Sequence, residues 1–184
     1  GLRVVHVPDQ HAKVAHCGFI FNVGSRDEAE DEHGLAHFLE HVLFKGTKKR
    51  KVHHVLNRMA VVGGEINAHT TKEDISVYSS FLTEYYPRAI ELLTDSCFHS
   101  VVLPKEIEKE KEVILDEVKS YLDNPYELIF EEFDSYLIPK HALGRPILGT
   151  PESIRAIDRK AILAFVQKHF HPEDTANSDF EQLL

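Results

Sequence analysis

The chain of 184 residues lacks several features that would assign it to a specialised class of protein. It has no excess of positive charge: its formal net charge of -9 at pH 7 argues against a general affinity for nucleic acid or anionic membranes. It contains no apolar run as long as a membrane span and no signal peptide, although a chain that begins with Gly1 leaves the question of export open. Internal repeats and glycine-rich phosphate loops are also missing. These absences favour one globular domain that binds neither nucleic acid nor membrane.

Cysteine is scarce, whereas histidine is plentiful. Cys17 and Cys97 could form at most one disulfide, and we interpret both as small core residues rather than ligands. Such usage suits a reducing compartment, so we expect a cytoplasmic location. Most of the 13 histidines need only a structural explanation, and a few could bind a metal.

Hydrophobic periodicity predicts an α+β fold with a mostly antiparallel sheet and helices packed on it. The segment 141–153 is predicted to be a loop, and the last residues show no alternation typical of a strand. The predicted strands are 2–7, 14–23, 65–70 and 74–82, and the predicted helices are 34–45, 51–61, 84–99, 104–122, 126–137 and 159–170.

Residues 34–47 read GLAHFLEHVLFKGT and combine an apolar helical face with a polar one. A helix advances about 100° per residue, so Leu35 and the apolar residues in register with it should face the core. His37, Glu40 and His41 fall together on the opposite side. Two imidazoles four residues apart on a helix lie about 5–6 Å from each other, which allows both to bind one metal ion. Imidazole and carboxylate ligands suit zinc.

A catalytic zinc site usually needs a third protein ligand, which must come from another segment. The helix predicted over 104–122 contains EKEVILDE, in which Glu110 and Glu117 lie on one edge of the apolar stripe. Glu106 lies near the same edge, and periodicity alone does not exclude it. The three remaining acids of this helix should point towards solvent. A carboxylate at the margin of a buried face needs a partner, and a metal ion would be one.

With these motifs the sequence resembles the inverted zinc metallopeptidases of the pitrilysin type, a family that includes the mitochondrial processing peptidase and insulin-degrading enzyme. The resemblance is carried by GLAHFLEH with FKGT after it, by NAHT, by EKEVILDE and by HALGRPILGT. It covers nearly the whole chain, and the combination is far more specific than H-x-x-E-H alone. The implied fold is the zinc-binding half of a two-half clamp.

The resemblance also implies a role for each matching residue. His37, His41 and Glu117 would bind Zn²⁺, and Glu40 would be the general base that takes a proton from the zinc-bound water. Glu110 would orient a ligand or support the base. Asn67 and Ala68 match the strand that pairs with the substrate backbone, as an extended peptide can add to an exposed strand edge.

Members of this family usually comprise two related halves, and this sequence matches the first. We therefore expect residues 1–184 to form a single N-terminal zinc-peptidase domain that lacks the second half and the strand expected after the last helix. The implied function is a zinc metalloendopeptidase, or its catalytic half, acting on peptides or unfolded segments. The implied partners are a peptide substrate, a homologous second half or partner subunit, and a possible homo-oligomer.

Other interpretations compete with this one. A non-catalytic partner or structural subunit could retain the same fold, although the complete ligand set argues against it. His33 lies four residues before His37 and could compete as a ligand, but it precedes the predicted helix. We interpret the acidic run from Glu28 to Glu32 as a solvated loop.

Overall fold

The computed structural model describes residues 2–170 and 175–178 of the chain. In this part it has five strands and seven α-helices. The strands are β1 (Arg3–Val5), β2 (Val14–Phe21), β3 (Glu65–Thr70), β4 (Ile75–Leu82) and β5 (Thr175–Ser178). The helices are α1 (Leu35–Leu43), α2 (Val52–Ala60), α3 (Tyr86–His99), α4 (Pro104–Leu122), α5 (Pro125–Leu137), α6 (Pro151–Ala156) and α7 (Arg159–His169).

The five strands form one sheet in the order β1-β5-β2-β4-β3. β2 pairs antiparallel with β4 and β5, and β3 pairs antiparallel with β4, whereas β1 and β5 are parallel. The predicted α+β class with a mostly antiparallel sheet is therefore confirmed. β3 is an edge strand, which leaves one side of its backbone unpaired within the described residues.

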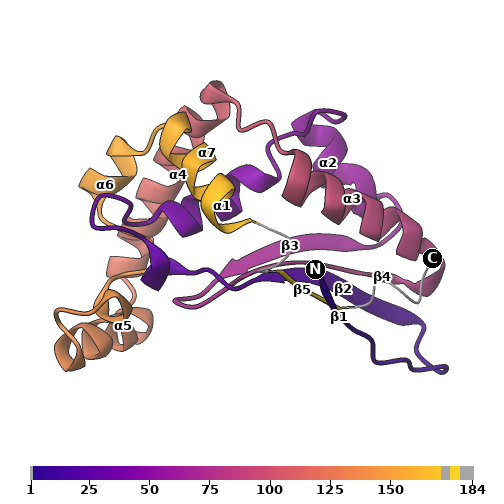
Figure 1. The fold of residues 1–184 in the computed structure, drawn as a ribbon, viewed down its shortest axis with the longest axis horizontal. Coiled ribbons are helices and arrows are strands. Elements are labelled where there is room, and N and C mark those ends of the chain that lie inside the picture. Colours follow the sequence, from indigo (N-terminus) through magenta and orange to yellow (C-terminus); the bar gives the residue numbers. More distant parts are fainter. Residues whose placement is uncertain (1, 171–174, 179–184) are drawn as a thin grey trace.

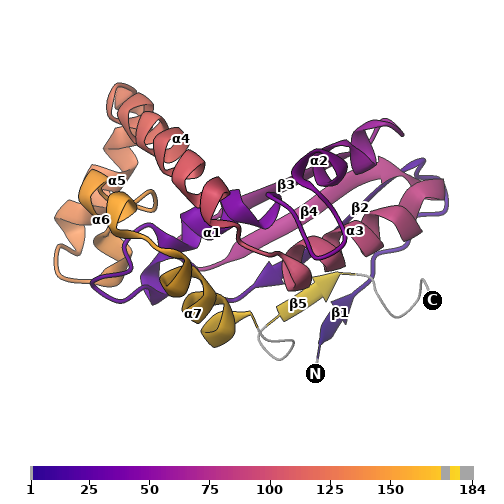
Figure 2. The ribbon, with the colours of Figure 1, turned by 90° about the horizontal axis from the view of Figure 1, so that it is seen from above.

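Helices α1, α2 and α3 lie over one face of this sheet, whereas α5 and α6 lie beyond one end of it (Figure 1, Figure 2). Buried and more exposed residues alternate along β4, as expected for a strand with one covered face. The core lies between this face and the helices, and it includes Phe21, Phe38, Leu39, Val77 and Phe165. Among the described residues, no helix combines the length and apolar character that crossing a bilayer requires.

The structure corrects two predictions about the second half of the sequence. A strand does follow the last helix: the backbone of β5 pairs with both β1 and β2. Its sequence, TANS, gives no apolar alternation, so pairing on both sides defines it rather than local propensity. Within the predicted loop 141–153, helix α6 begins at Pro151. Thr150 caps it by accepting a hydrogen bond from the Ser153 N–H, and this capping sequence was a detectable signal.

Candidate metal site

Helix α1 holds the two motif histidines between the sheet and α4. The predicted apolar face is confirmed, since Leu35, Phe38 and Leu39 are fully buried. His37, on the opposite side of the helix, is also buried, with an exposed fraction of 7%. The helix carrying the motif is therefore covered on both sides.

Glu28 stabilises the start of α1, which the sequence did not indicate. Its carboxylate accepts hydrogen bonds from the backbone N–H groups of Gly34 and Ala36, at 3.0 and 2.8 Å. Gly34 adopts a φ of 83°, a conformation that glycine tolerates best. Burial raises the pKa of Glu28 to about 8, despite these hydrogen bonds, which act in the opposite direction. Glu28 is thus a buried capping residue, and the interpretation of its segment as a solvated loop was wrong at this position.

Three side chains converge on one point between α1 and α4. Nε2 of His37 lies 3.7 Å from Oε1 of Glu117, and Nε2 of His41 lies 3.4 Å from Oε2 of the same carboxylate. The two imidazole rings have a centroid separation of 4.7 Å. One potential ligand atom from each of the three residues lies within 4.8 Å of the others. The structure thus brings together the three residues predicted to be ligands.

This arrangement fits a zinc ion. With zinc–nitrogen and zinc–oxygen distances of about 2.0–2.2 Å, ligand atoms around one tetrahedral ion lie about 3–3.5 Å apart. The distance of 3.4 Å from His41 to Oε2 of Glu117 already lies in this range, and the distance of 3.7 Å from His37 to Oε1 exceeds it only slightly. Two imidazoles and one carboxylate are also a ligand set that catalytic zinc uses, with a fourth position left open. Donor chemistry and spacing both suit the metal.

The protonation states of the cluster follow from burial and from the carboxylates. Burial lowers the pKa of His37 to about 4, with a smaller contribution from His41, so this ring is neutral at pH 7. Burial also acts to lower the pKa of His41, but its interactions with Glu117 and Glu110 outweigh that effect and raise it. The contact with His41 lowers the pKa of Glu117. In the metal-free protein, His41 and Glu117 therefore favour their charged forms.

Glu110 lies behind His41, on the side away from Glu117. Its Oε2 is 3.1 Å from Nδ1 of His41, and its Oε1 is 2.7 Å from Nζ of Lys45. With an exposed fraction of 4%, Glu110 is nearly inaccessible to water. A carboxylate on Nδ1 directs the other ring nitrogen, Nε2, towards the cluster, which is how metal-binding histidines are commonly oriented. Lys45 partners this buried charge, and sequence analysis did not identify it.

Glu40 lies on α1 between the two histidines and takes no part in the three-residue cluster. Its Oε2 accepts a hydrogen bond of 2.5 Å from Oγ1 of Thr70, the last residue of β3. Thr70 was not predicted to be a site residue, although it closes the NAHT motif.

Asn67 and Ala68, the predicted substrate-binding residues, lie on the edge strand β3. Oδ1 of Asn67 accepts a hydrogen bond of 2.9 Å from the backbone N–H of Ala68. Ala68 and Thr70 are buried, whereas Asn67 is exposed, in keeping with the alternation of a strand. Both predicted residues are thus at the unpaired edge of the sheet, near the strand end that contacts Glu40.

The competing ligand candidates lie outside the cluster. Nε2 of His33 is 2.7 Å from a guanidinium nitrogen of Arg145. Glu106, which periodicity could not exclude, pairs with Lys109 at 2.8 Å. The structure thus separates both residues from the histidine pair, which periodicity could not do.

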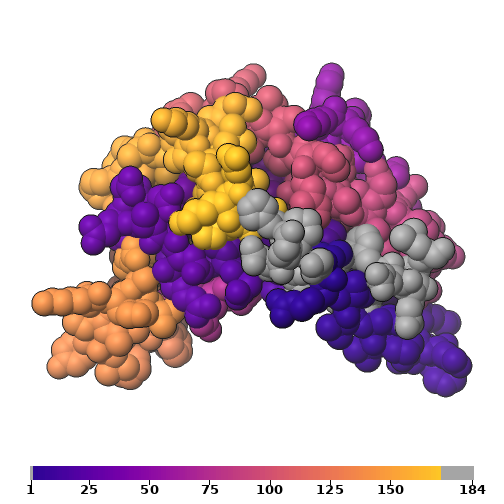
Figure 3. All heavy atoms as spheres, in the orientation of Figure 1, coloured from indigo at the N-terminus to yellow at the C-terminus, as the bar shows by residue number. Residues whose placement is uncertain are grey.

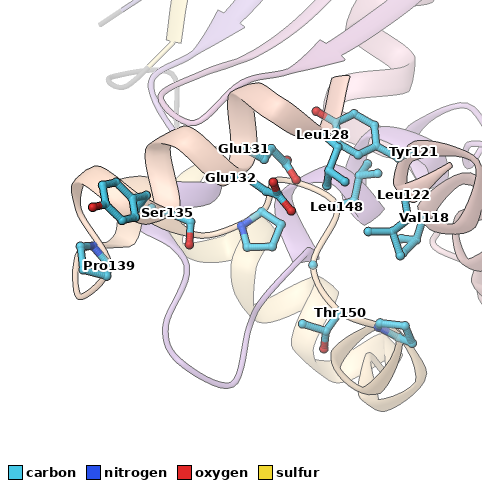
Figure 4. Close-up of a pocket in the computed structure, with 15 residues that line it drawn as sticks. Val118, Tyr121, Leu122, Leu128, Glu131, Glu132, Ser135, Pro139, Leu148 and Thr150 are labelled. Atoms are coloured by element: carbon cyan, nitrogen blue, oxygen red, sulfur yellow. The ribbon is translucent and has the colours of Figure 1, made fainter. Parts of the chain in front are cut away.

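A groove of about 890 Å³ begins one residue beyond Glu117. Val118, Tyr121 and Leu122 of α4 form one wall, and α5 with residues 139–151 forms the remainder (Figure 4). The lining is predominantly apolar, and Glu131 and Glu132 are its acidic members. None of the three clustered residues lines this groove, so it is separate from the candidate metal site.

Comparison with known proteins assigns the family. The family model described as Insulinase (Peptidase family M16) matches residues 3–151. The chain belongs to the M16 peptidase family. This assignment confirms the predicted family and agrees with the three-residue cluster that the structure brings together.

Several M16 relatives are named as zinc proteases. An uncharacterized zinc protease of Rickettsia bellii is 35% identical over 189 residues, and the match covers 100% of this chain and 46% of the relative. An uncharacterized zinc protease of Bacillus subtilis is 31% identical over 173 residues, covering 94% of this chain and 42% of the relative. This M16 chain thus spans less than half the length of these curated relatives.

Solved structures show the same fold. A putative M16-like peptidase from Alicyclobacillus acidocaldarius is 26% identical, with a TM-score of 0.85 over 94% of this chain and 42% of its own. A protease from Helicobacter pylori is 24% identical, with a TM-score of 0.89 over 100% of this chain and 45% of its own. An M16 inactive domain from Pseudomonas fluorescens, 18% identical, has a TM-score of 0.88 over 97% of this chain and 43% of its own. The M16 fold therefore occurs in domains described as peptidases and in one described as inactive.

Proposed function

We propose that this chain is the zinc-binding half of an M16 endopeptidase that hydrolyses peptide bonds in peptides or unfolded segments. The observation that carries the proposal is the convergence of His37, His41 and Glu117, with Glu40 beside them but outside the cluster. A domain that had lost catalysis would have no need to keep both the ligand set and an additional carboxylate. The zinc protease names of the relatives support the same activity.

In this proposal His37, His41 and Glu117 hold the metal. A bound zinc ion would acidify a water molecule and polarise the carbonyl of the bond to be cleaved. Glu40 would accept the proton of the attacking water at its carboxylate and later transfer it to the leaving amine. Glu110, 3.1 Å from Nδ1 of His41, would keep Nε2 of that ring directed at the metal position.

The edge strand β3 would bind the substrate backbone. Within the described residues β3 pairs only with β4, so its other side is available to an extended peptide. Added strands are bound by main-chain hydrogen bonds, and this mode tolerates varied side chains. Ala68 would take part through its backbone groups, and the Asn67 side chain would release the Ala68 N–H that it now binds.

A homologous second half, or a partner subunit, would complete the substrate chamber. This proposal of a second half rests on the length of the relatives, because the chain corresponds to only 46% and 42% of those from Rickettsia bellii and Bacillus subtilis. We further propose a reducing compartment such as the cytoplasm, because Cys17 and Cys97 are both buried and form no disulfide. Cell fractionation would test the location independently of activity.

Substitution of Glu40 by Gln tests the mechanism. The variant should keep about one zinc per chain, since Glu40 is not in the ligand cluster, but should lose hydrolysis of an unstructured reporter peptide. Glu112→Gln, which changes an exposed glutamate on α4, is the matched control and should cleave like the parent. Equal cleavage by Glu40→Gln and the parent, measured with the second half where turnover requires it, would contradict the mechanism.

The alternative is a non-catalytic partner subunit that keeps the fold. It would bind zinc at the same residues but show no turnover with or without a second half. Peptide assays of the zinc-loaded chain in both conditions separate the two functions.

A further inference from the structure

The contact between β3 and the glutamate of the motif has a role that the ligand set does not explain. We propose that Thr70 is a positioning residue that fixes the carboxylate of Glu40 for proton transfer. This inference rests on the proposed peptidase function and adds a residue to its machinery.

The geometry singles out Thr70 among the neighbours of Glu40. Its Oγ1 lies 2.5 Å from Oε2 of Glu40, a short distance typical of a hydroxyl that donates to a carboxylate. In the part of the chain that the structure describes, no other side chain forms a hydrogen bond with Glu40. Thr70 therefore holds one carboxylate oxygen and leaves Oε1 available as the proton acceptor.

The backbone that carries Thr70 is itself held firmly. Thr70 pairs with Ile75 at the end of the β3–β4 ladder. The turn that follows is closed by a hydrogen bond from the Thr71 N–H to the Asp74 carbonyl at 2.8 Å. Lys72 in the same turn binds Oδ2 of Asp134 on α5 at 2.5 Å and the carbonyl of Leu143 at 2.6 Å. These contacts limit movement of the strand end, as a preorganised donor requires.

Burial makes the hydroxyl more effective as a positioning group. The exposed fraction of Thr70 is 5%, so water has little access to compete for its hydroxyl. A free glutamate side chain on a helix could adopt several rotamers, and only some would direct an oxygen towards the reacting water. By selecting one of them, Thr70 would raise the fraction of enzyme ready for reaction. It would contribute to kcat and would leave zinc binding to the three ligand residues.

Three variants of the zinc-loaded protein, in the form that hydrolyses the reporter peptide, test this role. Thr70→Val keeps the shape of the side chain and should lower kcat by about 10–100-fold, the usual effect of losing a supporting hydrogen bond, with KM and zinc content unchanged. Thr70→Ser restores the hydroxyl and should recover most of the rate. Ser79→Ala is the control, because Ser79 on β4 is equally buried and donates a 2.5 Å hydrogen bond to the Glu65 carbonyl, away from the metal residues.

The outcomes separate this inference from the proposed function. Equal kcat values for Thr70→Val and Ser79→Ala, or an increase in KM alone, would overturn the role of Thr70. If Thr70→Val does not fold, Thr70→Ala replaces it under the same criteria. If the parent hydrolyses nothing, the peptidase proposal fails, and a crystal structure of the zinc-loaded parent still tests the positioning. A Glu40 carboxylate within hydrogen-bond distance of Thr70 would support it, and one turned away would overturn it.

Discussion

Helices α4 and α5 are adjacent in the sequence, but α4 buries several apolar side chains whereas α5 buries none. α4 buries Ile107, Ile114 and Val118 and presents Glu110 and Glu117 to the histidines. No residue of α5 is buried. Its large apolar side chains are exposed, with fractions of 86% for Tyr126, 72% for Phe130 and 84% for Tyr136, and the segment lies at one end of the molecule (Figure 3).

Polar contacts connect α5 to the rest of the chain. Lys72 binds Asp134, the Ile147 N–H donates to Glu131, and the Tyr121 hydroxyl donates to the carbonyl of Glu127. The candidate metal site is therefore contained within packed elements, whereas α5 contributes little to the core. Substitutions near the site should therefore affect metal binding and stability much more than substitutions on the outer side of α5.

Loss of a ligand should have the largest effect. His41→Ala removes one of the two imidazoles. It should weaken zinc binding by more than about 100-fold, because loss of an outer hydrogen-bond partner alone typically costs up to that much. His54→Ala, at an exposed position on α2, is the matched control and should bind zinc like the parent. Chelator competition would measure both affinities, and full zinc binding by His41→Ala would exclude this residue as a ligand.

Core substitutions compare the two regions directly. Leu39 is 1% exposed on α1, so Leu39→Ala should lower the free energy of unfolding by about 2–5 kcal/mol. Phe133 on α5 is 59% exposed, and Phe133→Ala should change the free energy of unfolding by about 0.5 kcal/mol or less. Denaturant unfolding of the metal-free chain would measure both. Similar losses for the two variants would show that α5 is part of the core after all.

Substitution of Lys45 should have a smaller effect on zinc binding at the same site. Lys45→Met leaves the buried Glu110 without its cationic partner, which should loosen His41 and weaken zinc binding by about 10–100-fold. Lys45→Arg should retain most of the affinity because it preserves the charge. Lys109→Met, at an exposed position on α4, is the control. A Lys45→Met affinity equal to that of Lys109→Met would contradict the proposed support of His41 through Glu110.

Proton competition should produce the mildest effect. Because the pKa of His41 is raised, a proton occupies this ring as the pH falls, and zinc must displace it. Zinc affinity should therefore increase as the pH rises towards the raised pKa of His41 and level off above it, with His41 responsible for the change. His37, with a pKa of about 4, should not contribute in this range. Titrations at several pH values would test this, and a flat profile would contradict it.

The raised pKa of His41 should also make the stability of the metal-free chain depend on pH. A raised histidine pKa means that the interaction of His41 with Glu117 and Glu110 stabilises the fold below the ordinary histidine pKa. That contribution should disappear as the pH rises through the raised value. Thermal unfolding of the metal-free parent and of His41→Ala would show the difference at low pH and not at high pH.

The sequence predicted the elements that carry the site because their signals are local. Gly34 and Gly46 bracket the α1 pattern, and both have positive φ angles, of 83° and 110°. The i, i+4 spacing placed His37 and His41 on one face, and the seven-residue spacing placed Glu110 and Glu117 on one edge of α4. Family resemblance then distinguished the two acids. In the structure Glu117 contacts both imidazoles, whereas Glu110 contacts that of His41.

The features that were missed depend on contacts between segments distant in sequence. Lys45 forms an ion pair with Glu110, and Thr70 donates a hydrogen bond to Glu40, which lies 30 residues away in sequence. Sequence periodicity does not predict either pair. Glu28 was interpreted as solvated because its neighbours are acidic, yet it is buried against the start of α1. β5 was missed because pairing with β1 and β2 defines it. Tertiary packing determines each of these features, so local propensity could not predict them.

If His37, His41 and Glu117 share one ion, a crystal structure of the zinc-loaded protein with anomalous data collected at the zinc edge should reveal it. One strong peak should lie about 2.0–2.2 Å from Nε2 of both histidines and from a carboxylate oxygen of Glu117. A peak at other residues, or no peak after loading with zinc, would contradict it.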